Sequence, residues 1–378
     1  MMGQGIQSNQ IAPPVRREEA VRRPKFIGGG DFQVELRRRM DEFFQRTGRS
    51  RRGCWQMSVK LATLFALFAA SYVLLVFVAQ TWWQAVPPAV LLGLATAAIG
   101  FNVQHDGGHQ AYSNRSWINK LTALTMDLIG GSSYVWHWKH NVFHHTYVNI
   151  TGHDSDIDLG ILGRLTPHQK HYWFHRWQHF YLWPLYGLLT INWHLVGDFH
   201  NVVTGRIGTC RFPRPRGWDL LLFLSGKMIF FTLALGIPLL VHRAWVVLLF
   251  FAAVEALLGM TLSIVFQLAH AVEEADFPMA QRNTGRMEHS WAVHQVETTV
   301  DFARGSRSMA WLLGGLNFQI EHHLFPNICH VNYPAMSQLV EATCREYGVR
   351  YTEHSSILAG LLSHYRWLRR MGRSNTTA

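Results

Sequence analysis

The stretch WHWKHNVFHHTYVN, residues 136–149, is the one around which the rest of the chain is organised. It contains His140, His144 and His145. On a helix with 3.6 residues per turn the first two lie on one face and the third lies about 100° further round, a spacing that permits metal binding. Two other stretches repeat the pattern. QHDGGHQ carries His105 and His109, and NFQIEHH carries Gln319, His322 and His323. We call these three stretches the histidine boxes.

Composition favours a membrane protein. The 378 residues include 15 Trp and 23 Phe, and 16% of them are charged, against about 25% in soluble domains. Much of the net charge of +11 comes from arginines in the first 57 residues, before the first apolar run. A basic segment next to a hydrophobic span is the positive-inside signal for a cytoplasmic N-terminus. No nucleic-acid-binding fold or aromatic interleaving accompanies these arginines, so we exclude nucleic acid as a partner.

Four apolar runs predict membrane spans, at about residues 58–80, 87–104, 220–241 and 244–267. Only His242 and Arg243 separate the last two runs, so the spans pair into two hairpins, and each hairpin returns the chain to the side of the N-terminus. All three histidine boxes then lie on one side of the membrane. The sequence thus predicts an all-α membrane protein with four transmembrane helices in two hairpins and a cytosolic helical cap that holds a histidine-rich dimetal site. Glu255, within the fourth span, is expected to face protein.

The remaining segments give weaker signals. Residues 1–30 are basic and rich in Pro and Gly, which predicts disorder. Residues 31–57 predict an amphipathic helix on the membrane surface, with a cytosolic packing helix as the alternative. The main domain is expected at residues 58–370, and residues 371–378 are expected to form a flexible C-terminus. The four cysteines form no CxxC pair, so neither a thiolate zinc site nor a redox dithiol is indicated.

A second group of histidines follows Thr166-Pro167-His168-Gln169, which predicts a helix start with Thr166 as N-cap and Gln169 closing a capping box. The expected helix carries a stripe of His168, His171, His175 and His179. No carboxylate or second cluster converges with this stripe. We therefore interpret it as polar surface on an interfacial helix and not as a metal site.

The number of ligands indicates how many metals are bound. His270, at the end of the fourth span, joins the box histidines to give eight imidazoles, with Gln319 as a further oxygen donor. The eight are His105, His109, His140, His144, His145, His270, His322 and His323. A single structural zinc takes four ligands, whereas two metals with four or five ligands each fit this set. Imidazole suits iron, zinc, copper and nickel, so the residue type alone leaves the metal open.

Other polar residues near the boxes are expected to support the ligands. Asp106 follows His105 directly and is expected to orient it. Asp154, Asp156 and Asp158 resemble the start of a calcium loop, but Leu residues replace its required Gly and Glu, so we expect support of the ligands there. His294 is expected to be structural.

The boxes HDGGH, HNVFHH and QIEHH, in this order and between two hydrophobic hairpins, resemble those of the membrane fatty acid desaturases. The flanking sequences look like the front-end branch of this family, especially cyanobacterial acyl-lipid Δ6 and bacterial linoleoyl-CoA desaturase-like proteins. These sequences are LNFQIEHHLFPNICHVNYP, TYVNITGHD and YGVRYTEHSSILAGLLSHYRWL. The similarity covers most of the chain from Arg37 to Trp367. One departure is that three residues separate His140 from His144, where many relatives have two.

The resemblance implies two iron ions bound by the box histidines, with His270 matching an additional ligand outside the boxes and Gln319 at a position where other branches have histidine. It also implies O2-dependent insertion of a cis double bond into an acyl-CoA or acyl-lipid substrate. The chain has no dinucleotide fingerprint, flavin site or HPGG haem module, so a separate ferredoxin, rubredoxin or cytochrome b5 is expected to deliver the electrons. The expected location is the inner or plasma membrane, with both termini and the active site cytoplasmic.

Two alternatives remain. A diiron membrane hydroxylase or carotenoid oxygenase would use similar boxes. A metal transporter should hold its ligands near mid-membrane, whereas these ligands follow the span ends. The sequence therefore disfavours a transporter.

Overall fold

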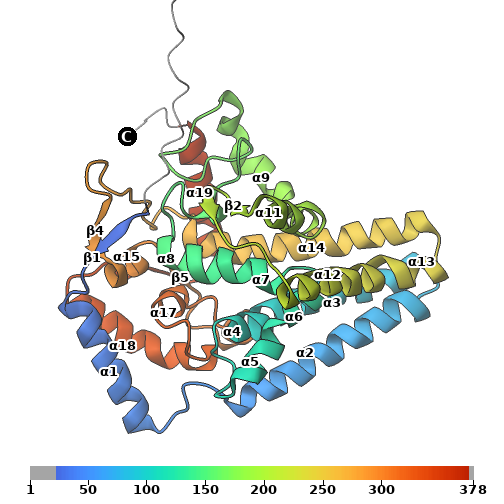
Figure 1. Cartoon of the computed structure of the whole chain (residues 1–378), viewed down its shortest axis with the longest axis horizontal. Coiled ribbons are helices and arrows are strands. Elements are labelled where there is room, and N and C mark those ends of the chain that lie inside the picture. The colour runs from blue at the N-terminus through green and yellow to red at the C-terminus, as the bar shows by residue number, and fades with distance from the viewer. Residues whose placement is uncertain (1–22, 374–378) are drawn as a thin grey trace, which may run out of the picture.

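The computed structural model describes residues 23–373, and most of them are helical (Figure 1). Four helical segments are long and apolar enough to cross a membrane: Trp55–Val78, Trp82–Gly108, Trp218–Val241 and Ala244–His270. They form two hairpins that extend to the right of a helical cap in Figure 1. We use "cap" for described residues 23–54, 109–217 and 271–373. The predicted all-α membrane fold is therefore confirmed, and the predicted spans differ from these segments by a few residues at their ends.

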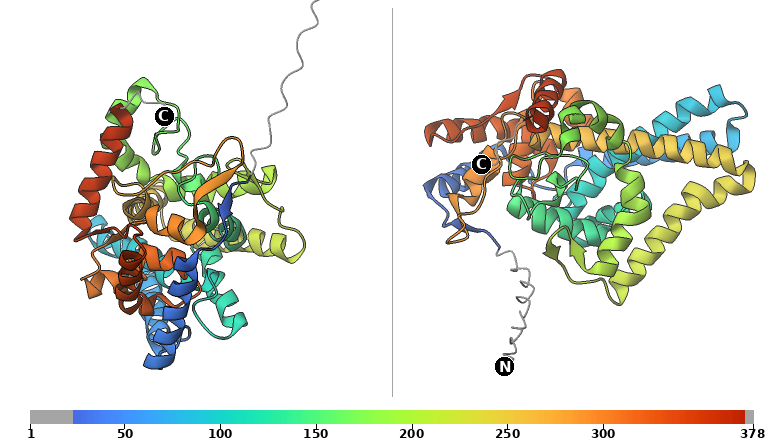
Figure 2. Two further views of the ribbon diagram at one scale, coloured as in Figure 1. Left: turned by 90° about the vertical axis from the view of Figure 1, so that its left-hand side faces the viewer. Right: turned by 90° about the horizontal axis from the view of Figure 1, so that it is seen from above.

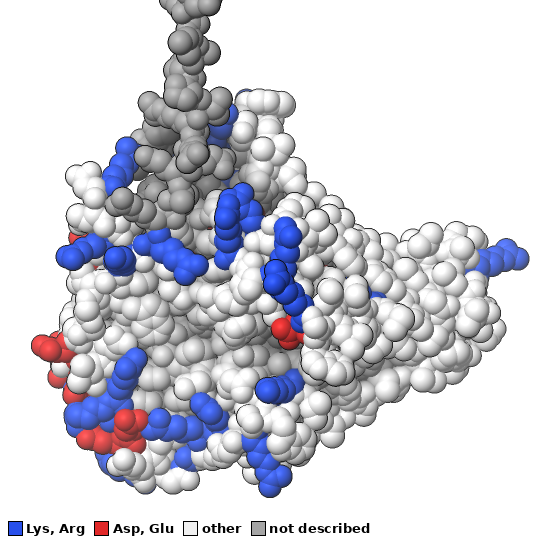
Figure 3. All heavy atoms as spheres, in the orientation of Figure 1, with Lys and Arg blue, Asp and Glu red and all other residues white. Residues whose placement is uncertain are grey.

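The first hairpin consists of α2 (Trp55–Val73), η1 (Leu74–Val78), α3 (Trp82–Ile99), η2 (Gly100–Gln104) and α4 (His105–Gly108). The second consists of α12 (Trp218–Phe231), η7 (Thr232–Gly236), α13 (Ile237–Val241) and α14 (Ala244–His270). The second span is 56% buried inside the protein, against 17% for the first. This difference makes α3 the central helix, which packs on both α2 and α14. Figure 2 shows the two hairpins side by side, and Figure 3 shows charged side chains over the cap with few on the hairpins.

The cap contains shorter elements, which the chain visits in three passes. Before the first hairpin lie β1 (Lys25–Ile27) and α1 (Asp31–Thr47). Between the hairpins lie α5 (Ser116–Ala123), α6 (Thr125–Leu128), α7 (Ser133–Trp136), η3 (His137–His144), α8 (His145–Tyr147), η4 (Ser155–Ile157), η5 (Trp173–Trp177), α9 (Gln178–Tyr186), α10 (Leu189–Asn192), η6 (Trp193–Gly197), α11 (Asp198–Thr204), β2 (Arg206–Ile207) and β3 (Cys210–Arg211). After them come β4 (Arg286–Ser290), α15 (Trp291–Glu297), β5 (Asp301–Phe302), α16 (Arg307–Leu312), α17 (Gln319–Leu324), η8 (His330–Asn332), α18 (Tyr333–Glu346), β6 (Glu353–His354) and α19 (Ile357–Arg373). The strands pair as β1–β4, β2–β3 and β5–β6.

Helix α1 is amphipathic as predicted, but the partner of its apolar face differs from the expectation. Phe32, Leu36, Met40 and Phe44 are buried in one cluster with residues of α15, α17 and α18. The apolar stripe therefore packs on the cap and is not free to enter a lipid surface. This packing agrees with the alternative interpretation of this segment, a packing helix.

The two ends of the described chain are more ordered than expected. Residues 1–22 and 374–378 lie outside the described residues. Within the predicted disordered segment, Lys25–Ile27 forms β1 and pairs with β4 in parallel. Helix α19 continues through the start of the predicted flexible C-terminus to Arg373, because Met371 and Gly372 are buried against other cap residues.

The predicted helix start at Thr166 was wrong. Gln169 Oε1 does accept hydrogen bonds from the backbone N–H groups of Leu165 and Thr166, so capping contacts form, but no helix follows them. The next side-chain bonds lead away from the segment, with His168 Nε2 donating to Phe277 O (2.8 Å) and Gln169 Nε2 to Ile157 O (2.8 Å). Helical structure begins only at η5.

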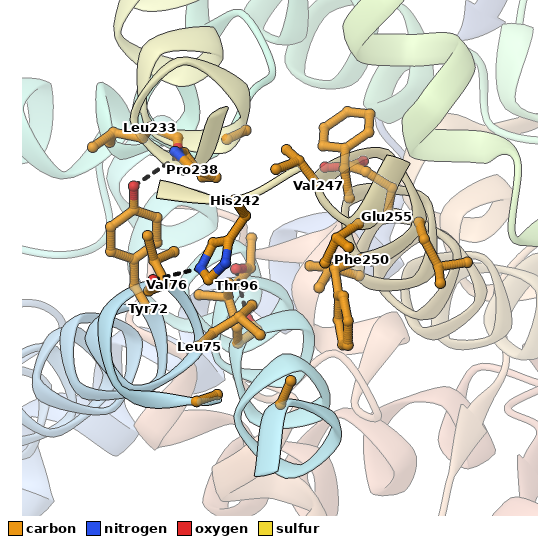
Figure 4. Close-up of a pocket in the computed structure, with 18 of the residues that line it drawn as sticks. Tyr72, Leu75, Val76, Thr96, Leu233, Pro238, His242, Val247, Phe250 and Glu255 are labelled. Atoms are coloured by element: carbon orange, nitrogen blue, oxygen red, sulfur yellow. Dashed lines mark hydrogen bonds between the residues drawn. The ribbon is translucent and has the colours of Figure 1, made fainter. Parts of the chain in front are cut away.

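Two charged residues inside the spans, Glu255 and Lys227, face protein, as expected for Glu255. Its side chain is 4% exposed, and its Oε2 lies 3.1 Å from His194 Nδ1. Lys227 on α12 is also buried, and its Nζ lies 2.8 Å from Asp198 Oδ2. An apolar cavity of about 400 Å³ lies beside Glu255, between the two hairpins (Figure 4). Across this cavity Tyr72 Oη donates to Leu233 O (2.8 Å) and ties the hairpins together.

Candidate metal centre

The three histidine boxes and His270 converge at the end of the hairpins that joins the cap. Helix α3 continues through η2 into α4, which carries the first box, while α14 ends at His270. The second box lies on η3 and α8, and the third on α17. All eight imidazoles are at most 8% exposed. The convergence predicted from the topology is therefore present.

Seven of the eight histidines divide into two metal-sized sets. Within each set, one candidate ligand atom per residue lies within 4.8 Å of all the others. The first set is His105, His109, His140 and His322, and the second is His144, His270 and His323. His145 forms a third such set with His322 and His323. It therefore lies between the two main sets, which makes two adjacent metal positions sterically available.

The second box lies on a π-helix, which the sequence did not predict. In η3 (His137–His144) the bonds run from residue i to i+5, and the backbone N–H of His145 donates to His140 O. This turn brings His140 and His145 to the same side, with their Nε2 atoms 3.2 Å apart. His144 also stays beside His140, with the two rings stacked at 5.2 Å. The wider turn thus accommodates the three residues between His140 and His144 and points all three histidines at the centre.

Several side chains fix the orientation of the imidazole rings from outside. His144 Nδ1 donates to Asp154 Oδ2 (3.0 Å), and His323 Nδ1 donates to Gln295 Oε1 (2.8 Å). A bond to one ring nitrogen leaves the other nitrogen of each ring for a metal. The expectation for Asp154 is therefore met, whereas Asp158 only caps a local turn at Gly160.

The structure places Gln319 against a histidine. Its side-chain amide lies 3.0 Å from His270 Nε2, and His270 Nδ1 has no hydrogen-bond partner. Because the oxygen and nitrogen of an amide can be exchanged by a flip, Gln319 Oε1 can accept the proton of His270 Nε2. Gln319 is thus well placed to orient His270.

Asp106 does not orient His105, contrary to expectation. Its Oδ2 accepts hydrogen bonds from His330 Nδ1 (2.9 Å) and His330 N (3.2 Å). His330 Nε2 in turn lies 2.8 Å from the Nζ of Lys60, which also donates to Asn102 Oδ1 (2.6 Å). Sequence reasoning missed this network. Its available signal was Lys60, the one charged residue in the first apolar run, because an ionisable group in a span usually has a buried partner.

Burial controls the charge of the box histidines. It lowers the pKa of His140, His145, His322 and His323 well below the ordinary value, and the neighbouring histidines lower it further. For His144 burial also acts to lower the pKa, but the Asp154 carboxylate outweighs it and the net shift is upward. Neutral imidazole is the form that binds metals. The box histidines whose pKa is lowered are therefore in the neutral form that binds cations.

Unpartnered nitrogens give an independent sign of a metal site. Five ring nitrogens of the cluster are buried without a hydrogen-bond partner among the described residues: His109 Nε2, His145 Nδ1, His270 Nδ1, His322 Nε2 and His323 Nε2. Buried polar atoms are normally paired, so five orphans in one place require an explanation. A metal site between the rings would account for such orphans, and the donor set fits metals that accept imidazole.

The other predicted histidines lie away from this centre. His294 is buried, and its Nε2 donates to Val148 O (3.0 Å), as expected for a structural residue. In the stripe, His168, His171 and His175 each bond a backbone carbonyl. Trp136 forms a wall of the centre, with its indole stacked on His140 at 4.6 Å.

Replacing Asp154 by asparagine tests the support of the ligands. The change removes the carboxylate that holds His144 Nδ1, and loss of such a partner weakens metal binding by about 10–100-fold. We expect metal affinity in D154N, measured by competition with a chelator, to fall by this factor. Asp158→Asn is the matched control, because Asp158 is exposed and contacts no histidine of the centre. Equal affinities in the two variants would show that Asp154 does not support the ligand.

Four span-length helices with a cluster of eight buried histidines at one end define a class of membrane enzyme with a metal centre. Comparison with known families identifies the class of enzyme. The family model "Fatty acid desaturase" matches residues 81–355, and the chain belongs to this family. It is therefore an oxidoreductase of lipid metabolism that acts on a fatty acyl substrate in the membrane.

Curated relatives match nearly the whole chain. A sn-1 linoleoyl-lipid 6-desaturase from Arthrospira platensis is 35% identical over 341 residues, which cover 90% of this chain and 92% of the relative. The enzyme of the same name from Synechocystis sp. is 32% identical and covers 93% and 99% of the two chains. An acyl-lipid (8-3)-desaturase from Physcomitrium patens is 32% identical, over 90% of this chain and 72% of the relative.

Proposed function

We propose that this protein inserts a cis double bond into the acyl chain of a membrane lipid, on the carboxyl side of an existing double bond, in an O2-dependent reaction at a pair of iron ions. The observation that carries the proposal is the cluster of eight buried histidines. Seven of them form two sets, and His145 groups with His322 of one set and His323 of the other. The relatives support the substrate, because two of them are named linoleoyl-lipid 6-desaturases. An acyl-CoA substrate is the less favoured form of the same proposal.

The two ion positions have distinct ligand sets in this proposal. His105, His109, His140 and His322 hold one iron, and His144, His270 and His323 hold the other, with His145 between them. Gln319, a further candidate donor, contacts His270 and is placed to orient it. When bound, the iron pair supplies the oxidising power toward O2 and an unactivated methylene that no side chain can provide. The protein buries the imidazoles away from water and holds the rings of His144 and His323 from outside.

The cavity of Figure 4 supports a hydrocarbon substrate. Apolar residues such as Leu75, Leu233 and Phe250 line it. Thr96, which also lines it, is nine residues before His105, or about 14 Å along a helix. A lipid chain in the membrane therefore has an apolar recess that extends from the hairpin turns, at Trp82 and His242, toward the span ends where the histidines lie.

Electrons must come from a separate carrier in this proposal, since the chain contains no flavin or dinucleotide motif. A ferredoxin, a rubredoxin or a cytochrome b5 fits, and the net charge of +11 favours an acidic one. The basic segment before the first span supports cytoplasmic termini and a cytoplasmic active site in the inner or plasma membrane. The orientation makes the centre accessible to such a carrier.

A hydroxylase or carotenoid oxygenase remains the second candidate, because a histidine cluster alone does not choose among these reactions. A transporter is disfavoured, since the histidines gather at the span ends and not between the helices at mid-membrane.

Fatty-acid profiling distinguishes these functions. A host that expresses the chain and is fed oleate or linoleate is expected to accumulate a product with two hydrogens fewer, with the new double bond between the carboxyl group and the first existing one. A host that expresses His144→Ala at the same membrane level should lack this product. A product with an added oxygen would identify a hydroxylase, and an unchanged profile from iron-loaded protein with a working electron donor would reject the proposal.

A further inference from the structure

The histidine stripe left unexplained by the metal centre borders an open hollow of about 700 Å³. One wall is η5 with the start of α9, and the other is the last turns of α19. The polar side chains that line it are mostly basic: Arg176, His179, Arg369 and Arg373. The hollow therefore collects positive charge from two segments that are almost 200 residues apart in the sequence.

These arginines have no acidic partner. Among the described residues 23–373, no carboxylate lies within ion-pair distance of Arg176, Arg369 or Arg373, whereas the adjacent Arg370 pairs with Glu273 at 3.6 Å. The Arg176 guanidinium stacks on the indole of Trp177 at 3.7 Å. Stacking fixes its position but does not neutralise it. Three guanidinium groups thus line one hollow without a counter-charge from the described residues 23–373.

His179 adds a buried imidazole to this group. It is 4% exposed, yet its Nδ1 has no hydrogen-bond partner among the described residues. It differs in this from the other three stripe histidines, each of which bonds a backbone carbonyl. Its ring is held between Phe180 and Tyr365. The His179 ring therefore forms part of the wall of the hollow, with one buried nitrogen left unsatisfied.

The two walls of the hollow are locked together. A Cβ atom on Gly372 would lie 2.1 Å from His175 O, so only glycine permits this contact between α19 and η5. His171 Nε2 also donates to Gly372 O (2.9 Å). The two segments that carry the basic groups are therefore held together, which lowers the cost of binding a ligand between them.

The surroundings of the hollow are those of a membrane interface. Trp173, Trp177 and Phe180 at its rim are 72%, 42% and 58% exposed. Helix α9 ends against the fourth span, because a Cβ atom on Gly259 would lie 2.8 Å from Gly187 O. The nine residues of α9 measure about 13 Å, so the hollow lies within about one short helix of the span. Exposed tryptophans beside arginines are typical of the headgroup region.

We propose that this hollow binds the anionic head group of a membrane phospholipid. Arg176, Arg369 and Arg373 contact the phosphate oxygens. Planar guanidinium groups match phosphate geometry well. Free inorganic phosphate has the same chemistry, but the exposed aromatic rim favours a ligand whose apolar part continues into the bilayer. The site is separate from the histidine centre and does not depend on the reaction proposed above.

The test uses the full chain, purified in detergent and stripped of lipid. It is titrated with dioctanoyl phosphatidylglycerol, dioctanoyl phosphatidylcholine and inorganic phosphate, with tryptophan fluorescence as the readout. We expect saturable binding of phosphatidylglycerol only. Arg176→Gln and Arg369→Gln should each weaken it about fivefold, as expected for loss of one arginine near a lipid surface. Arg366→Gln is the matched control, because Arg366 is exposed on the same helix but does not line the hollow.

Four results would overturn the proposal. The first is equal phosphatidylglycerol affinity in the wild type and in an Arg176→Gln/Arg369→Gln double variant. The second is equal binding of phosphatidylcholine, which would make the interaction independent of charge. The third is binding of inorganic phosphate as tight as that of the lipid, which would leave an adventitious ion only. The fourth is arginine-dependent binding of an acidic ferredoxin in place of the lipid. The metal content of each variant, expected to equal that of the wild type, separates loss of this site from loss of the fold or of the metal centre.

Discussion

His323→Ala is expected to abolish desaturation and to lower the bound metal while the protein still inserts in the membrane. His323 belongs to the second histidine set and also lies with His145 and His322. Its Nδ1 is held by Gln295 and its Nε2 is unpartnered. Loss of the ligand itself should exceed the loss of about 100-fold that follows removal of a ligand's hydrogen-bond partner. The measurement pairs fatty-acid profiles with metal content.

The matched control for this change is His294→Ala. His294 is as buried as His323 but bonds only Val148 O and belongs to no histidine set. This variant should keep its metal, even if the loss of one buried hydrogen bond lowers its stability. Normal turnover in His323→Ala would remove it from the ligand set.

Lys227→Met is expected to give the largest loss of stability outside the metal centre. Lys227 Nζ lies 2.8 Å from Asp198 Oδ2 and donates to Gly130 O (2.6 Å), and both charged side chains are at most 4% exposed. Removing one partner of a buried ion pair leaves the other charge uncompensated, which typically costs about 3–5 kcal/mol. Thermal unfolding in detergent should show a clearly lower midpoint.

The double variant Lys227→Met/Asp198→Asn serves as the control, because it also removes the stranded carboxylate. Its midpoint should lie above that of the single variant. An unchanged midpoint in Lys227→Met would mean that the pair contributes little, and that the buried carboxylate is protonated without it.

The spans and the convergence of the boxes were predictable because they depend on the mean hydropathy of long segments and not on individual contacts. Apolar runs of about 20 residues cross a bilayer whatever their neighbours are. The predicted ends of all four spans therefore lie within a few residues of the ends in the structure. The tight turn at His242 and Arg243 then fixed the side on which α14 delivers His270. The grouping of eight histidines followed from topology alone.

Features that depend on individual partners were not predictable. The pattern of α1 showed that one face is apolar but not that α18 covers it. The capping pattern at Thr166 does not start a helix, because side chains of this segment bond distant carbonyls such as Phe277 O. Asp106 is adjacent to His105 in sequence but bonds His330, 224 residues away. The π-helical turn at residues 137–144 has no recognised sequence pattern, although it determines how His140 and His145 meet.

The most direct test of the central claim is the metal content of the purified, full-length chain, measured by mass spectrometry together with O2 consumption in the presence of a reduced ferredoxin. Two adjacent histidine sets predict close to two irons per chain, with O2 consumed only when an acyl-lipid substrate is supplied. One metal ion per chain, or bound zinc without O2 consumption, would contradict the diiron desaturase assignment.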